Sequence, residues 1–103
     1  MEFPNGRVGS IFFSPAIYNG AGTVKTLEDV RAMATCPAGA ITVGSITVKP
    51  RTGNEGDVFW VGPQGSLNSL GIPNGGVPYY QKNLPEMVKI AHGAGKPLIV
   101  NVA

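Results

Sequence analysis

The residues best suited to binding a ligand lie in one glycine-rich stretch, residues 65–76. It contains two asparagines, two serines and four glycines: Asn68, Asn74, Ser66, Ser69, Gly65, Gly71, Gly75 and Gly76. Backbone amides and Asn carboxamides can bind the edge of a flat polar ring, because they offer donors and acceptors without a net charge. The same residue types also form turns. Composition alone therefore leaves ring binding and a purely structural loop equally open.

Two other side chains, His92 and Cys36, are of types that often take part in catalysis or metal binding. His92 precedes Gly93 near an expected helix end, where an imidazole can interact with the last carbonyls and the helix dipole. Cys36 precedes a proline and has no cation or histidine close by in sequence to activate it, which favours a small buried apolar group. A single cysteine and a single histidine also exclude an internal disulfide and a Cys- or His-rich metal site. No metal is expected.

The segment Gly20-Ala21-Gly22 imitates the start of a G-x-G-x-x-G dinucleotide motif. Lys25 stands where the third glycine is required, so a dinucleotide fingerprint is not predicted. No G-K-[ST] sequence is present, which excludes a P-loop. The two glycines still allow the backbone to turn sharply or to approach another group closely.

Strands alternate with helices along the chain, and this pattern predicts an α/β fold built of parallel βαβ units. Apolar runs predict parallel strands at 16–18, 40–45 and 98–102, after a short N-terminal edge strand. A further short strand is expected at 57–61, followed by a long loop over 62–76.

Capping signals predict where the helices lie. Residues 26–29 fit a capping box, so a helix is expected to start at Thr26, and Pro37 stops it near Thr35. A second helical region is expected at 78–82, and Pro85 is expected to begin a further helix. Gly93 or Gly95 can cap that helix in the left-handed conformation.

Length and composition narrow the functional classes. The chain has 103 residues, enough for one domain, and its net charge is +2. Its eight Lys and Arg residues are scattered rather than gathered into a stripe, which argues against a nucleic-acid partner. No apolar run approaches the ~18 residues of a membrane span, and the N-terminus does not resemble a signal peptide. A cytoplasmic protein with no membrane partner is therefore expected.

The predicted elements do not complete a domain. Three parallel strands with two helices cannot cover both faces of a sheet, and the charged fraction of 14% is well below the roughly 25% of a usual soluble domain. The chain is therefore interpreted as the front portion of a larger protein. The alternative is a small non-enzymatic α/β module that is completed by dimerisation.

Residues 66–74 closely resemble the N-S-[ML]-G-[LI]-P-N segment of dihydroorotate dehydrogenases, in particular of the soluble class 1 branch. Tyr79-Tyr80 follow, as in that family. Residues 14–22 resemble the family's N-P … N-A-S-G turn after the first barrel strand, and residues 26–29 resemble its T-x-E-[DE] helix start. Residues 45–54 are similar to its S-x-T … P-R-x-G-N stretch after the second strand. The likeness covers nearly the whole chain.

The resemblance implies that residues 1–103 are the N-terminal part of an FMN-binding TIM-barrel domain and supply its first three βα units. It implies oxidation of dihydroorotate to orotate in pyrimidine biosynthesis, by an enzyme that is a homo-oligomer when full length. The catalytic base and the loops that bind the FMN phosphate are expected beyond Ala103. The chain by itself is therefore expected to be inactive.

The resemblance also implies roles for particular residues. Gly20, Ala21 and Gly22 would pass their backbone along the flavin ring, and Ser45 would approach the flavin. Asn68 would bond the edge of a dihydroorotate-like substrate, with the backbone of Leu70, Gly71 and Ile72 closing over it.

One departure from the family concerns Gly44. The family carries a lysine just before the serine at the end of the second strand, where its ammonium stabilises developing negative charge. Lys49 is the nearest cation that follows Ser45 in this chain. The change at Gly44 motivates a second enzymatic reading, a related flavin barrel acting on another pyrimidine or cyclic amide.

Overall fold

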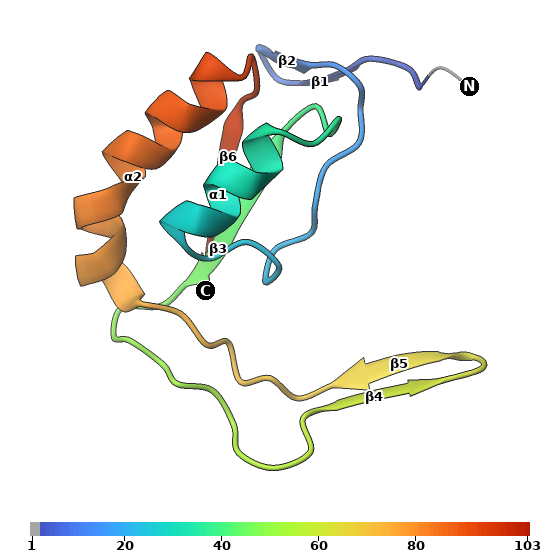
Figure 1. Ribbon diagram of the computed structural model, residues 1–103, viewed down its shortest axis with the longest axis vertical. Coiled ribbons are helices and arrows are strands. Elements are labelled where there is room, and N and C mark those ends of the chain that lie inside the picture. Colours follow the sequence, from blue (N-terminus) through green and yellow to red (C-terminus); the bar gives the residue numbers. More distant parts are fainter. Residues whose placement is uncertain (1–2) are drawn as a thin grey trace.

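Helices and strands alternate along the chain in an α/β arrangement (Figure 1). The structure is a computed structural model, and it describes residues 3–103. The elements follow in the order β1 (Gly6–Val8), β2 (Ile11–Phe13), α1 (Leu27–Ala34), β3 (Ile41–Ile46), β4 (Phe59–Gly62), β5 (Gly65–Asn68), α2 (Gly76–Gly93) and β6 (Leu98–Val102).

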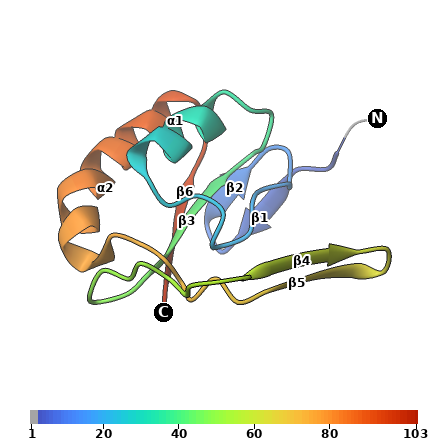
Figure 2. The same cartoon turned by 60° about the horizontal axis from the view of Figure 1, so that its bottom comes forward.

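The centre of the fold is the parallel pair formed by β3 and β6. Ile41 lies opposite Leu98, and Val43 lies opposite Val100. Both helices pack against this pair (Figures 1 and 2). Burial of the apolar run at the start of β3 agrees with a parallel strand that is covered by helices. The predicted parallel strands at 40–45 and 98–102 are thus confirmed.

The predicted first parallel strand at 16–18 is not formed, so the count of three βα units is not confirmed. Only an isolated parallel bridge joins Tyr18 to Ala40. The next position along β3, Thr42, has its N–H and its C=O bonded to the side chain of Asn19 instead of to a neighbouring strand. Because this carboxamide takes the place of a backbone partner, the ladder stops after one bridge.

The N-terminal edge strand is in fact a hairpin. β1 and β2 pair antiparallel, with Gly6 opposite Phe13 and Val8 opposite Ile11. Gly9 lies in the two-residue connection with φ +59°, a conformation that favours glycine. Sequence analysis missed the hairpin because the apolar residues before the Ser14-Pro15 turn were interpreted as one short edge strand.

The predicted start and end of α1 are confirmed. The Oγ1 of Thr26 accepts from the Asp29 N–H at 3.1 Å, and the Asp29 carboxylate accepts from the Thr26 N–H at 3.0 Å. These reciprocal bonds satisfy amides that a helix start otherwise leaves unpaired. Thr35 is the C-cap. The ammonium of Lys96, just before β6, donates to the carbonyls of Met33 and Cys36 and so ties the end of α1 to the start of β6.

The prediction of two separate helical regions near 78–82 and after Pro85 was wrong. α2 is one helix of 18 residues with Pro85 inside it. An interior proline costs about 3 kcal/mol in a helix. Tyr80, Met87 and Ala91 are buried on both sides of Pro85, and their packing in the core holds the helix together. Gly95, with φ +73°, follows the helix end as expected.

The long loop predicted over 62–76 contains a strand. β4 and β5 form an antiparallel hairpin in which Trp60 lies opposite Leu67, and it projects from the rest of the structure (Figure 2). Trp60 and Leu67 are 57% and 71% exposed. The sequence predicted β4, at 57–61, but its partner strand is composed of Gly, Ser, Leu and Asn and has no strand signal.

The core is a single cluster between the helices and the β3–β6 pair. Its fully buried members include Val30, Ile41, Val43, Tyr80 and Met87. Neither of the two helices in residues 3–103 has the length and apolar character that crossing a membrane requires.

We expect the capping box of α1 to make stability depend on acid pH. The backbone N–H groups of Lys25 and Thr26 lower the pKa of Asp29 below its ordinary value of 3.8. A lowered pKa contributes stability in full above the ordinary value, and this contribution is lost as the pH falls through the lowered pKa. Urea unfolding of the parent chain and of Asp29→Asn should show a difference at neutral pH that shrinks as the pH falls below the ordinary pKa of 3.8 and through the lowered one. A difference that stays constant through this range would contradict the assignment.

Candidate functional site

Most of the predicted site residues line one cavity of about 440 Å³. We call it the Asn68 cavity; it is lined by Ala21, Gly22, Lys25, Ser45, Asn54, Asn68, Ser69, Leu70, Gly71, Ile72 and Pro73. Seven of the eight predicted site residues are among them. The eighth, Gly20, lines a neighbouring cavity of about 580 Å³ together with Ala21, Thr42 and Asn101. Residues that are far apart in sequence are thus brought to one place.

The turn that carries Ala21 and Gly22 is fastened to β3 by hydrogen bonds. The Asn19 carboxamide donates to the Thr42 carbonyl at 2.7 Å and accepts from the Thr42 N–H at 2.9 Å. Further along β3, the Gly22 N–H donates to the Gly44 carbonyl at 2.7 Å, and the Gly44 N–H donates to the Val24 carbonyl at 3.0 Å. The turn therefore follows the strand to its carboxyl end and faces the cavity there.

The end of β3 has no room for a side chain at Gly44. Gly44 has φ +121°, and a Cβ at this position would overlap the carbonyl oxygen of Asn101 on β6. Next to it, the Asn101 carboxamide donates to the Ser45 hydroxyl at 2.6 Å. A lysine could not replace Gly44 without a change in the backbone. Asn101 was not recognised in the sequence, because its contact with Ser45 depends on the register of β3 and β6.

The loop after β5 is held in place by residues 51–54. The guanidinium Nε of Arg51 donates to the Gly71 carbonyl at 2.8 Å. The Asn54 carboxamide donates to the Ser69 carbonyl at 2.8 Å, and the Asn54 N–H donates to the Leu70 carbonyl at 3.0 Å. These bonds fix the carbonyl groups of three consecutive residues of the loop, which leaves their positions in the cavity well defined.

The two asparagines of the loop have different surroundings. The Asn74 carboxamide oxygen accepts from the Gly76 N–H at 2.8 Å and from the Thr47 N–H at 3.2 Å, so Asn74 shapes the turn. The Asn68 carboxamide has no hydrogen-bond partner among residues 3–103 and lines the cavity. Composition left the two roles open, and the hydrogen bonds of Asn74 give that asparagine the structural role.

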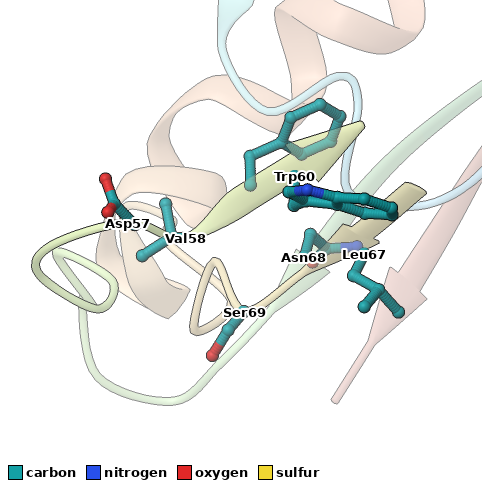
Figure 3. A pocket seen from close by; sticks show the side chains of 7 residues that line it. Asp57, Val58, Trp60, Leu67, Asn68 and Ser69 are labelled. Atoms are coloured by element: carbon teal, nitrogen blue, oxygen red, sulfur yellow. The ribbon is translucent and has the colours of Figure 1, made fainter. Parts of the chain in front are cut away.

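Asn68 also borders a second, smaller pocket on the β4–β5 hairpin. Figure 3 shows Trp60, Leu67 and Asn68 close together around it, with Asp57, Val58 and Ser69 on its other side. This pocket has a volume of about 290 Å³. Asn68 therefore lies where the hairpin and the larger cavity meet.

Lys25 is the charged residue of the Asn68 cavity, and no other charged residue of the described chain lines it. Lys49, the nearest cation after Ser45 in sequence, is exposed and is not part of the lining. Sequence analysis noted Lys25 only as the residue that breaks a glycine motif. Its position directly after the glycine turn was the available signal, because that turn is bonded to the end of β3.

The remaining chemically versatile residues stay outside this site. His92 is exposed in the last turn of α2, and Cys36 is half-buried with its Sγ 3.9 Å from the Met33 Sδ. Within residues 3–103, no group of three or more His, Cys, Asp or Glu side chains is placed to hold a metal ion.

We expect Gly44→Ala to destabilise the chain, because the new Cβ meets the Asn101 carbonyl and the φ of Gly44 is unfavourable for other residues. The free energy of unfolding should fall by about 2 kcal/mol or more. Gly93→Ala is the matched control, since its Cβ would meet no atom within 4 Å, and it should be neutral or slightly stabilising. Urea denaturation measures both. Equal stability of the two variants would show that a Cβ at Gly44 fits beside the Asn101 carbonyl.

Comparison with known proteins identifies the family. The family model for dihydroorotate dehydrogenase matches residues 7–103. The chain is 34% identical over 85 residues to the probable dihydroorotate dehydrogenase A (fumarate) of Enterococcus faecalis, over 76% of this chain and 27% of that protein. It is 42% identical over 69 residues to the dihydroorotate dehydrogenase (fumarate) of Trypanosoma brucei brucei, over 66% of this chain and 22% of that protein.

A third relative is matched over a longer part of the chain. The dihydroorotate dehydrogenase (fumarate) of Trypanosoma cruzi is 34% identical over 92 residues, which cover 88% of this chain and 28% of that protein. The chain thus spans about a quarter of the length of the curated relatives that it matches. Its cavity-lining turn, strand end and loop all fall inside the matched region, and the chain belongs to the dihydroorotate dehydrogenase family.

Proposed function

We propose that this chain is the N-terminal part of an FMN-dependent oxidoreductase that converts dihydroorotate to orotate in pyrimidine biosynthesis. The observation that carries the proposal is the Asn68 carboxamide, which has no partner among residues 3–103 and lines a cavity with the glycine turn and Lys25. Family membership supports the reaction class. The chain alone is expected to be inactive, and the base that accepts the substrate's proton is proposed to come from the rest of the enzyme.

The residues present fit the ring of a flavin. A Cβ added at Gly20 or Gly22 would meet no atom within 4 Å, so a flat group can approach this backbone closely. In the neighbouring cavity, the Thr42 hydroxyl is buried and has no hydrogen-bond partner among the described residues. Ala21, Gly22 and Ser45 would lie along the ring, with Gly20 at its side. FMN, when bound, accepts a hydride from the substrate.

The chain's own contribution is to bind and orient the substrate. The Asn68 carboxamide presents one acceptor and two donor hydrogens, which match the adjacent N–H and C=O groups on a pyrimidine ring edge. The backbone N–H groups of Leu70, Gly71 and Ile72 bond to no acceptor among residues 3–103, so they are free to close over the ring. Held in this way, the ring carbon that loses hydride would stay in contact with the flavin face.

Lys25 supplies the positive charge that the family places at the end of the second strand. An ammonium near the carboxylate of dihydroorotate lowers the cost of binding an anion and stabilises negative charge that develops in the ring. Because Gly44 has no room for a side chain, the cation reaches the cavity from the turn before α1 instead. This arrangement favours a carboxylate-bearing substrate. The alternative is an uncharged cyclic amide, and the absence of a lysine at Gly44 is the observation that supports this alternative.

In the complete flavoenzyme, we expect Asn68→Ala to lower kcat/KM by about tenfold to a hundredfold, because each lost buried hydrogen bond costs about 1–3 kcal/mol. Melting temperature and FMN content should change little. Asn74→Ala is the comparison, since Asn74 bonds the loop backbone; it should lower the melting temperature instead. If Asn68→Ala loses several degrees of melting temperature while kcat/KM per bound flavin is unchanged, Asn68 is a turn residue and the assignment is wrong.

We expect Lys25→Met to weaken the binding of orotate by about tenfold or more, because the anion then loses its partner in a site of low dielectric. Lys49→Met removes an exposed cation that does not line the cavity and is the matched control, with little expected effect. Titration of the flavin absorbance with orotate measures both. Similar orotate affinities for the two variants would favour the uncharged cyclic amide as substrate.

A further inference from the structure

Tyr80 of α2 connects the core to the Asn68 cavity through a single hydrogen bond. Its side chain is 2% exposed and is among the largest fully buried side chains of the described chain. Its hydroxyl donates to the carbonyl oxygen of Lys25 at 2.8 Å, across 55 residues of sequence. The core therefore holds the backbone of the one charged residue that lines the cavity within the described chain.

The backbone of Lys25 is held on both sides. While its carbonyl accepts from Tyr80, its N–H donates to the Asp29 carboxylate at 2.9 Å. The two peptide groups that flank the Cα of Lys25 are thus fixed to α2 and to α1. Fixing both groups restricts φ and ψ, and with them the direction in which the side chain leaves the backbone.

The neighbouring Tyr79 makes a similar bond to a different residue. Its hydroxyl accepts from the Leu27 N–H at 3.0 Å, at the first residue of α1. The two rings pack edge to face, with centroids 5.1 Å apart and an angle of 87°. Tyr79 and Tyr80 therefore tie α2 to the same part of the chain, but only Tyr80 contacts Lys25 through its hydroxyl.

We infer that Tyr80 is a positioning residue of the Asn68 cavity: its hydroxyl, together with Asp29, sets the direction from which the Lys25 ammonium approaches the anionic group of the ligand. The inference rests on the proposed function, in which Lys25 faces the carboxylate of orotate. A purely structural role would require only the ring in the core. The hydroxyl is additional, and its acceptor is the backbone of a cavity residue.

The electrostatic surroundings of Tyr80 agree with a permanent donor. Burial raises the pKa of Tyr80, and Tyr79 and the Asp29 carboxylate raise it further. The phenol therefore stays protonated at neutral pH and keeps its hydrogen for the Lys25 carbonyl.

The test compares Tyr80→Phe with Tyr79→Phe in the complete flavoenzyme. Both variants keep the ring and remove one hydroxyl that bonds the backbone at or just before the start of α1, so they are matched in packing. The ligands are orotate and its 6-carboxamide analogue, which has the same ring without the charge. Titration of the flavin absorbance gives the dissociation constants, and urea denaturation gives the stability of each variant.

We expect Tyr80→Phe to weaken orotate binding by about fivefold to twentyfold, with a much smaller effect on the carboxamide. Tyr79→Phe should leave the ratio of the two affinities unchanged, although its stability falls to a similar extent. The inference would be overturned if Tyr80→Phe leaves the ratio of the orotate and carboxamide affinities unchanged. It would also be overturned if both variants change this ratio equally. If Tyr80→Phe does not fold, Asp29→Ala, which removes the acceptor of the Lys25 N–H, is tested by the same ratio.

Lys25→Met separates a failure of the inference from a failure of the proposed function. If Lys25→Met abolishes the preference for orotate and Tyr80→Phe does not alter it, the charge role of Lys25 stands and the positioning role of Tyr80 is wrong. If Lys25→Met leaves the preference unchanged, the assignment of Lys25 is wrong and the inference falls with it. A second readout is the NMR signal of dimethylated Lys25, which should shift on adding orotate in the parent enzyme and much less in Tyr80→Phe.

Discussion

The site depends on the way the Asn19 carboxamide replaces a backbone partner on β3. By bonding both the N–H and the C=O of Thr42, this side chain ends the strand pairing that begins at Tyr18 and Ala40. The chain is then free to turn at Gly22 while it remains attached to β3 through Gly44. A continued strand would satisfy the same groups of β3, but it would place no open glycine backbone at the strand end. The Asn19 side chain thus replaces a regular strand pairing with an open glycine backbone at the cavity.

The position of the charge follows from a steric limit. Since Gly44 has no space for a side chain beside Asn101, a cation cannot reach the cavity from that position. Lys25 lines the cavity from the turn before α1, and Asp29 and Tyr80 hold its backbone by hydrogen bonds. Asp29 therefore has two contacts of consequence: it caps α1, and it holds the backbone of a residue that lines the cavity. The capping box that starts the helix also orders the residue that precedes it, so local helix stability and the geometry of the proposed anion site are coupled through Asp29.

The β4–β5 hairpin shows how a weak element can carry a residue of the proposed site. An isolated two-stranded hairpin is marginally stable in water, and the apolar side chains of this one, such as Trp60 and Leu67, are largely exposed. Its base is fixed, however: the Ser69 N–H donates to the Val58 carbonyl, and Asn54 holds the residues that follow Asn68. Asn68 lies at this fixed base rather than at the tip of the hairpin, which suits a group proposed to meet a ring edge with defined geometry.

Local signals in the sequence determined much of this protein. The capping box at Thr26 and Asp29 and the apolar runs of β3 and β6 each depend on neighbouring residues, and each was predicted correctly in place. Tertiary structure decided the rest. Packing of Tyr80 and Met87 carried α2 through Pro85, the Asn19 side chain ended the first strand, and β5 formed without a strand pattern by pairing with β4. The cavity itself, lined by Lys25 among others, depends on contacts between residues 15 to 56 positions apart, and no local pattern encodes such contacts because their free energy arises only when the core brings the segments together.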